Sequence, residues 1–370
     1  MNKQEFLKRL NTNDDAKMDV IKELKGEKLP LVMWGIGDVG AAVFEYLTSQ
    51  GISIDSIWVD NIQNEQNNYN NVEISSLSDI TKKYEGFNVV LGHSHYELGK
   101  ELCTKYPQIK NVYYVFSIHY EQYAPVKYED IECEADRFVN LIDKLEDNKS
   151  VDHLLAYLNT KMTGNSEFIF DVYETEMSFF KNDIYEVTDN EILLDIGAYD
   201  GDTIREFLSK TKEGKYSKII ALEPDDESFV RLNKYVAQNR MKNVVTSMLG
   251  AWNECTDLKF DTGNEQLSSV VSSSDNAGQN SMTIYADRLD NLFFEPVTLI
   301  KINYFMGVLE AVQGCEEILK NYHPKMAIDV GFDIYNVLLL FEYVNSLNLN
   351  YKFYLRFNRA MSSTFTLYMV

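Results

Sequence analysis

The chain has 370 residues, of which 45% are hydrophobic and 25% are charged, so it is long enough for two domains with packed cores. Its formal net charge of -22 repels nucleic-acid phosphates and anionic lipid surfaces, and we expect neither nucleic acid nor a membrane as a partner. The first ten residues lack an apolar signal core and no stretch approaches the roughly 20 apolar residues that span a bilayer, which predicts a cytoplasmic protein.

The first candidate strand, residues 31–34, runs into a glycine-rich turn that is followed by an amphipathic helix. The turn matches the GxGxxG pattern of dinucleotide-binding turns, and an acidic residue ends the next apolar strand. These features define a second possible nucleotide site made of Gly35, Gly37, Gly40 and Asp60. Only residues 88–91 and 112–115 follow as further strands, which predicts a small, half-sized Rossmann-like domain. The glycines serve either a ligand or close packing of helix on strand.

His93 and His95 follow the strand at residues 88–91 and would lie near the same crevice. No third ligand accompanies them, so we predict no metal site. The four cysteines form no CxxC pair, which also argues against zinc and against a disulfide framework. We expect all four to be buried as small hydrophobic residues. They are Cys103, Cys133, Cys255 and Cys315.

A charged stretch with helical apolar spacing at Phe138, Leu141 and Leu145 separates two strand-turn-helix patterns. We therefore divide the chain into a small Rossmann-like α/β domain over residues 1–118, a helical connector over 119–189, and a larger nucleotide-binding domain over 190–370.

The second strand-turn-helix pattern begins with the strand at residues 192–195 and has acidic residues around its glycines. A ligand of a doubly wound sheet binds beyond the carboxyl ends of the strands, where this turn would lie. Its negative charge is wrong for a pyrophosphate but suits a cationic ligand, since carboxylates accept hydrogen bonds from an ammonium group. S-adenosylmethionine, which carries a sulfonium and an ammonium, is therefore favoured over NAD.

The next strand ends at Glu223, which is placed to accept hydrogen bonds from both ribose hydroxyls of such a ligand. Pro224 ends that strand and Asp225 can cap the following helix. The predicted cofactor residues from the turn and this strand end are Asp195, Gly197, Ala198, Tyr199, Asp200, Gly201, Asp202, Glu223 and Pro224.

Further candidate strands alternate with helical patterns, which predicts a parallel sheet with helices on both faces. They cover residues 218–223, 244–251, 297–303 and 326–330. The last two, residues 351–357 and 364–370, have no helix between them and must pair antiparallel, closing the sheet with a hairpin.

The segments Leu194 to Thr203 and Ala221 to Pro224 resemble the FkbM family of S-adenosylmethionine-dependent methyltransferases. The resemblance covers about half of the chain and continues through Leu249 to Trp252, Ala286 to Asp290, Leu299 to Ile302, Tyr354 to Arg356, and Leu367 with Tyr368. It implies a Rossmann-like class I methyltransferase fold and adds Gly250 and Ala251 to the cofactor residues. It also implies O-methylation of a hydroxyl group on a sugar, a glycan or a related metabolite.

The chain departs from that family after the strand that contains Lys301, where an acidic run is replaced by Asn303 and apolar residues. Lys301 and Asn303 are candidates for orienting an acceptor. They can equally be a strand-end lysine and the cap of a helix over residues 306–321. Near the C-terminus, Ser363 and Thr364 stand where relatives carry a Glu-Thr pair.

Three functions remain open at this point. The first is a methyltransferase acting on a small-molecule or glycan substrate. The second is a catalytically silent binding or scaffold protein that keeps the cofactor fold, which the replaced acidic run suggests. The third is an oxidoreductase that binds NAD at Gly35 to Gly40 with Asp60 on the ribose; the short first domain argues against it.

Overall fold

The computed structural model describes residues 1–10, 16–60, 68–93, 96–99, 101–115, 126–163, 167–174, 178–181, 183–261, 269–270, 281–303, 307–331, 333–358 and 365–370. The chain divides into two compact units. The first comprises Met1–Asp136 and Asp152–Glu174, and the second comprises Arg137–Val151, Thr175–Asn358 and the C-terminal strand.

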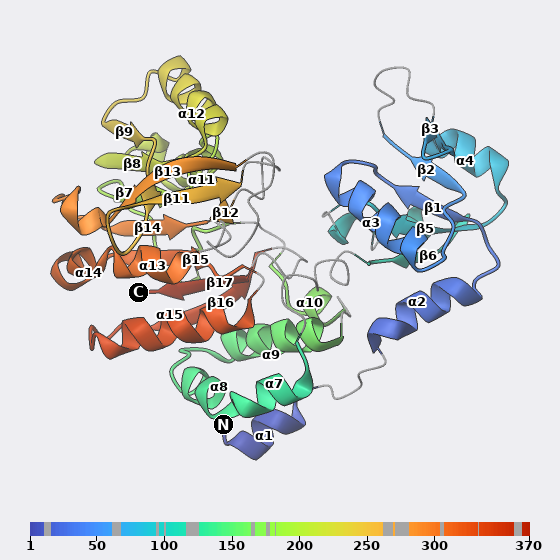
Figure 1. The fold of residues 1–370 in the computed structure, drawn as a ribbon, viewed down its shortest axis with the longest axis horizontal. Helices are drawn as coiled ribbons and strands as arrows, with labels where there is room; N and C mark the ends of the chain where they lie inside the picture. Colours follow the sequence, from blue (N-terminus) through green and yellow to red (C-terminus); the bar gives the residue numbers. More distant parts are fainter. Residues whose placement is uncertain are drawn as a thin grey trace. The chain divides into compact units, whose positions relative to one another are not determined.

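The first unit is built on a six-stranded sheet in the order β3-β4-β2-β1-β5-β6 (Figure 1). All neighbouring pairs are parallel except β3 with β4. The strands are β1 (Leu31–Trp34), β2 (Ser56–Trp58), β3 (Asn68–Tyr69), β4 (Val72–Ser75), β5 (Phe87–Leu91) and β6 (Ile109–Tyr113). The sequence patterns missed β3 and β4, because these short strands are half-exposed and lack an apolar run.

The central strands of this unit, β1 and β5, are buried on both faces and are apolar apart from the buried Asn88 of β5. The helices that the first unit contains, wholly or in part, are α1 (Lys3–Lys8), α2 (Ala16–Gly26), α3 (Asp38–Ser49), α4 (Leu77–Lys83), α5 (Leu102–Lys105), α7 (Tyr128–Cys133), α8 (Ala135–Ile142), α9 (Asn148–Thr163) and α10 (Glu167–Phe170). Val43, Phe44 and Leu47 of α3 pack into a core with Met33 and Val90 of the sheet.

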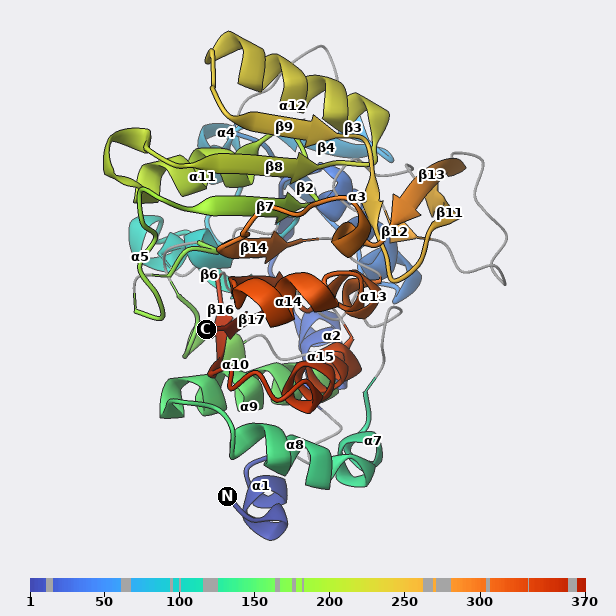
Figure 2. The same ribbon diagram turned by 90° about the vertical axis from the view of Figure 1, so that its left-hand side faces the viewer.

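The second unit contains a seven-stranded sheet in the order β16-β17-β15-β14-β7-β8-β9; Figure 2 shows β9, β8, β7 and β14 side by side. Its strands are β7 (Ile192–Ile196), β8 (Lys218–Leu222), β9 (Val244–Ser247), β14 (Leu299–Ile302), β15 (Lys325–Asp329), β16 (Phe353–Phe357) and β17 (Phe365–Met369). Only β17 runs against its neighbours, β15 and β16. The predicted parallel sheet closed by a C-terminal antiparallel hairpin is confirmed.

Helices cover both faces of this sheet. The helices are α11 (Asp202–Lys210), α12 (Asp226–Gln238), α13 (Val308–Gln313), α14 (Glu316–Tyr322) and α15 (Ile334–Ser346). Phe207 of α11 and Leu232 of α12 share a buried core with Leu193 of β7. On the opposite face, Phe341 of α15 meets Phe353 of β16 edge to face.

A second sheet in this unit has the order β10-β13-β11-β12, with β10 (Gly250–Ala251), β11 (Thr256–Asp261), β12 (Ser269–Val270) and β13 (Ser281–Asp287). The expectation of one strand over residues 244–251 was therefore wrong. The chain leaves the main sheet after Ser247, and Gly250 pairs with Ala286 of β13 instead. Sequence reasoning missed β11, β12 and β13 as strands.

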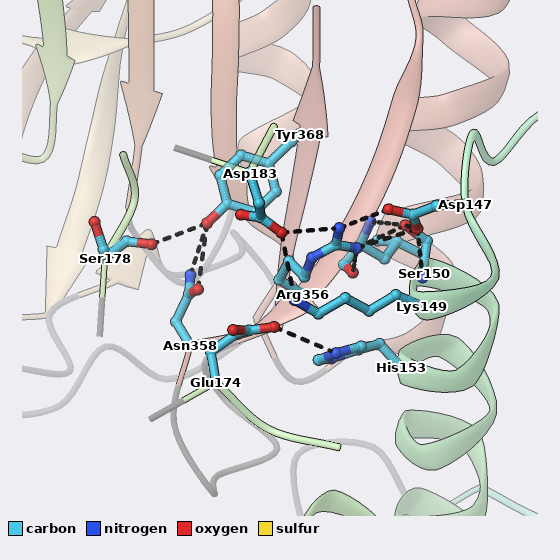
Figure 3. A network of polar contacts seen from close by, with 11 residues as sticks. Asp147, Lys149, Ser150, His153, Glu174, Ser178, Asp183, Arg356, Asn358 and Tyr368 are labelled. Carbon is cyan, nitrogen blue, oxygen red and sulfur yellow. Dashed lines mark hydrogen bonds and ion pairs between the residues drawn. The ribbon is translucent and has the colours of Figure 1, made fainter. Parts of the chain in front are cut away.

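The buried Arg356 of β16 lies at the centre of a polar network (Figure 3). Its guanidinium lies 2.7 Å from Asp147 and 3.3 Å from Asp183, and it donates to Ser150 Oγ at 2.9 Å. Next to it, Asn358 donates to Tyr368 Oη at 3.0 Å. These contacts fix the segment around residues 147–150 against the terminal hairpin.

Helix α14 ends at Tyr322, because His323 takes a left-handed conformation as its C-cap. The expectation of four buried cysteines was wrong: Cys315 is buried, whereas Cys103, Cys133 and Cys255 are exposed. None of the helices in the described part of the chain combines the length and apolarity needed to cross a bilayer.

Candidate functional site

The register of the seven-stranded sheet brings several predicted residues to the carboxyl ends of its central strands. Asp195 of β7 pairs in register with Lys301 of β14. Because side chains two residues apart share a face of a sheet, Glu223, Asn303 and Asp329 follow on the same face, just beyond this row. The ends of β8, β7, β14 and β15 thus gather three carboxyl groups, one amide and one ammonium.

The glycine turn between β7 and α11 has the backbone conformation that its sequence requires. Gly197, Tyr199 and Gly201 all have positive φ, at 76°, 47° and 89°. Gly201 caps α11, and a β-carbon on it would lie 2.8 Å from the Tyr235 ring. Glycine is needed at Gly201 both for its conformation and for the close approach of α12.

Asp195 is buried under this turn beside Lys301. The Lys301 ammonium lies 3.0 Å from Asp195 Oδ1. Neither carboxylate oxygen makes a well-oriented hydrogen bond with the described residues. Burial raises the pKa of Asp195 to about 6, although Lys301 opposes the shift. Asp195 is fully buried, so its charge acts on the turn through the protein interior and has no contact with solvent.

Glu223 directly follows β8 and faces the same turn. Its Oε2 accepts from the Tyr199 N–H at 2.7 Å, and its Oε1 accepts from the Asp225 N–H at 2.9 Å. Each oxygen keeps one lone pair for a further donor. Burial raises the pKa of Glu223 to about 7, against the effect of these backbone donors. The predicted capping role of Asp225 is confirmed, since it accepts from the Ser228 N–H at 2.8 Å.

The remaining predicted cofactor residues lie in different surroundings. Asp200 pairs with Arg205 at 2.6 Å, and Asp202 is exposed in the first turn of α11. Ala198 is part of the buried core, and Pro224 is half-buried beside Glu223. Gly250 and Ala251 are buried in β10 of the four-stranded sheet.

The two predicted catalytic residues differ in their access to a substrate. Lys301 is 0% exposed and donates to the Gly197 carbonyl oxygen at 2.6 Å, so its ammonium is turned toward the glycine turn. Asn303 is half-buried at the end of β14. The alternative that Asn303 caps a helix over residues 306–321 is wrong, because Gly307 caps α13 and a separate helix follows. Ser363 and Thr364 lie outside the described residues.

Asp329 is a candidate that the sequence patterns did not single out. It ends β15, next to the strand end that carries Asn303, and its Oδ1 accepts from the Gly331 N–H at 2.8 Å. Burial raises the pKa of Asp329 to about 7. The sequence carries one signal for this residue: it is an acid at the end of the apolar run Met326 to Ile328. Its place next to β14 follows from the register of the sheet, which cannot be read from the sequence.

The first glycine turn shows close packing at one glycine and open space at another. A β-carbon on Gly40 would lie 2.5 Å from the Gly35 carbonyl oxygen, whereas one on Gly37 would meet nothing within 4 Å. Asp60 accepts from Trp34 Nε1 at 3.3 Å. His93 packs edge to face on Trp34, and His95 lies outside the described residues. Among the described residues, no cluster of acidic, histidine and cysteine side chains is suited to a metal ion.

Comparison with known proteins places this geometry in a known fold. No protein-family model and no curated protein sequence matches the chain. A solved structure, methyltransferase FkbM from Methylobacillus flagellatus, is similar over 99% of this chain and 98% of its own, at 18% identity and a TM-score of 0.69.

Two other solved structures match the chain over about half its length. An rRNA methylase from Streptococcus thermophilus is similar over 50% of this chain and 87% of its own, at 16% identity and a TM-score of 0.32. Aeropyrum pernix fibrillarin, solved with bound S-adenosyl-L-methionine, is similar over 50% of this chain and 68% of its own, at 11% identity and a TM-score of 0.32.

The full-length similarity to methyltransferase FkbM confirms the predicted fold class. The second unit has the Rossmann-like class I methyltransferase fold, with its terminal antiparallel hairpin, and a smaller α/β unit precedes it.

Proposed function

We propose that this protein is an S-adenosylmethionine-dependent methyltransferase that modifies a hydroxyl group of a sugar, a glycan or a related metabolite. The observation that carries the proposal is the joint placement of the glycine turn, Asp195 and Glu223 at the carboxyl ends of β7 and β8, in a fold shared with a methyltransferase. In open α/β sheets, ligands bind at this edge.

The residues present fit this cofactor. Glu223 has two lone pairs left for the ribose hydroxyls, and it is held in place by two backbone N–H groups. Asp195, which pairs with Lys301 at 3.0 Å, and the exposed Asp202 place carboxyl groups around the turn. An acidic turn of this kind favours a ligand that brings a sulfonium and an ammonium.

The cofactor, when bound, supplies an electrophilic methyl group. The protein must then hold an acceptor oxygen in line and remove its proton. Asp329 suits the second task, because a carboxyl whose pKa lies near 7 takes up a proton at neutral pH more readily than an ordinary aspartate. Asn303 and Asp329 each follow the last registered pair of β14 and β15, Ile302 with Ile328, and the Asn303 amide can orient the acceptor.

Calorimetric titration of S-adenosylmethionine into the full chain tests the proposal. We expect binding to the native protein and a loss of about tenfold or more in affinity for Glu223→Ala, since a charge-assisted partner is removed. The matched control is Glu295→Ala, which removes an acid that pairs with Lys218 at the opposite end of the same strand. Absence of binding to well-folded native protein would contradict the proposal.

The same titration separates the other two functions. A scaffold protein that keeps the fold would bind the cofactor yet transfer no tritiated methyl group to a panel of free sugars and nucleotide sugars. An oxidoreductase would bind NAD, and Asp60→Ala rather than Glu223→Ala would weaken that binding.

A further inference from the structure

We propose that Lys301 is a positioning residue of the cofactor site: it braces the glycine turn through the Gly197 carbonyl and keeps Asp195 anionic beneath the turn. The inference rests on the proposed function for the identity of the ligand. It replaces the role of acceptor contact that the sequence suggested for Lys301.

The contacts of Lys301 leave no part of its ammonium for a substrate. The side chain is 0% exposed, pairs with Asp195 at 3.0 Å and donates to the Gly197 oxygen at 2.6 Å. The Phe179 ring lies against it, with its centroid 5.5 Å from Nζ. A buried ammonium is retained only where its charge is balanced and its donors are used, and these three partners meet both needs.

The hydrogen bond from Lys301 to the Gly197 carbonyl acts on a turn whose other contacts come from the end of β8. The N–H groups of Gly197 and Ala198 donate to the Leu222 oxygen, and the Tyr199 N–H donates to Glu223. Lys301 adds a contact from β14, so the turn is fixed between two strands. A turn preformed in this way loses less conformational entropy when a ligand binds.

The electrostatic part of the role concerns Asp195. Asp202 and Glu206 of α11 repel its charge, so Lys301 is the nearby cation that favours the ionised form. Glu223 at the end of β8 and Asp329 at the end of β15 also feel the Lys301 charge. Without Lys301, Asp195 and Glu223 would both take up a proton at higher pH, and fewer ionised carboxylates would face a ligand at the turn.

The chain offers a matched control in Lys325. This lysine pairs with the buried Glu191, donates to the Glu186 carbonyl oxygen at 3.0 Å and lies 5.5 Å from the Tyr185 ring centroid. It therefore makes the same three kinds of contact as Lys301, but at the amino ends of the strands. Lys325→Met removes the cation that pairs with a buried carboxylate without touching the glycine turn.

The first measurement is amide hydrogen exchange of the ligand-free protein. We expect Lys301→Met to speed exchange at residues 197–201 by about tenfold, since one hydrogen bond to a charged donor is lost. Lys325→Met should leave these amides unchanged. Equal exchange at the turn in Lys301→Met and native protein would overturn the brace, whether or not the protein binds the cofactor.

The second measurement is the pH dependence of S-adenosylmethionine affinity. Native affinity should fall as the pH drops through about 7 and then about 6, where Glu223 and then Asp195 gain a proton. In Lys301→Met the fall should begin at a higher pH, and affinity at pH 7 should be about tenfold or more below that of Lys325→Met. An unchanged profile would overturn the electrostatic role. If Lys301→Met speeds exchange at the turn but the native protein does not bind S-adenosylmethionine, the proposed function is refuted and the brace is not.

Lys301→Gln separates the two roles and is the second variant if Lys301→Met does not fold. Its amide can still donate to the Gly197 carbonyl but carries no charge. We expect turn exchange close to the native rate together with the shifted pH profile. A native pH profile in this variant would refute the electrostatic role. In an Asp195→Asn background, the same substitution should produce a smaller shift, because Asp195 no longer responds to the lost charge and Glu223 still does.

Discussion

Gly307 lies flat against the indole ring of Trp252: a β-carbon on this glycine would come within 2.1 Å of Trp252 Cζ3. Gly307 also has a φ of +84° and caps α13. Trp252 directly follows β10, where its N–H donates to the Asp287 oxygen. The contact therefore ties the start of α13 to the four-stranded sheet.

We expect Gly307→Ala to lower the free energy of unfolding by about 2 kcal/mol or more, because backbone strain and a clash with an aromatic ring add together. The control is Gly214→Ala, which has a φ of +68° and nothing within 4 Å of the added carbon. That variant should lose only about 1 kcal/mol, the cost of a left-handed alanine. Urea denaturation of both variants gives the comparison. Equal losses of unfolding free energy in the two variants would mean that the Trp252 ring moves aside at no cost in stability.

Arg356 provides a test of the polar network in Figure 3. Its side chain is 1% exposed, whereas Arg137, paired with Glu342 at 2.6 Å, is about a third exposed. We expect Arg356→Met to cost about 1–3 kcal/mol, because the buried Ser150 hydroxyl loses a charged donor and the partly exposed Asp147 and Asp183 lose a shared cation. Arg137→Met should cost about 0–1 kcal/mol. Similar losses of stability in the two variants, measured by urea denaturation, would contradict this ranking.

The sequence was sufficient to predict the elements that carry their own local signal. The apolar runs before the two glycine turns, the acid at Glu223 and the Asp225 cap all follow from residue type and spacing. The terminal hairpin followed from a length argument, since β16 and β17 leave no room for a crossover helix.

The missed features depend on contacts between distant segments. Strands β11 and β13 pair with one another rather than with the main sheet, and their short runs are half polar. The roles of Lys301 and Asp329 follow from register across β14 and β15. Burial of a lysine ammonium cannot be inferred from a strand pattern alone, because its partners lie about 100 residues away in the chain.

Asp329 should make stability depend on pH in a defined direction. Its pKa is raised from 3.8 to about 7 by burial, so the folded state binds this proton more tightly than the unfolded state. The ionised carboxyl therefore costs stability increasingly as the pH rises from about 4 through 7.

Asp329→Asn removes this charge and keeps the oxygen that accepts from the Gly331 N–H. We expect the variant to be more stable than the native protein at pH 8, by about 1–3 kcal/mol, with no gain near pH 4. Thermal unfolding at several pH values measures the difference. A difference that does not change with pH would show that Asp329 titrates as an ordinary aspartate.

Each glycine of the first turn can be assigned separately, either to packing or to the binding of a ligand. Gly40 is enclosed by the Gly35 and Gly92 carbonyl oxygens, at 2.5 and 2.9 Å from an added β-carbon. Gly37 has a φ of -73°, which any residue adopts, and open space around it. We expect Gly40→Ala to destabilise the protein by about 2 kcal/mol or more, and Gly37→Ala to change stability by less than about 0.5 kcal/mol.

Titration of NAD into both variants completes this test. Glycine at position 37 has no packing role, so only the close approach of a ligand to the start of α3 would require it. If the native chain binds NAD and Gly37→Ala does not, the turn holds a nucleotide. If Gly37→Ala is instead as unstable as Gly40→Ala, glycine at position 37 has a packing role as well, because the backbone of the turn must then approach a neighbour more closely there.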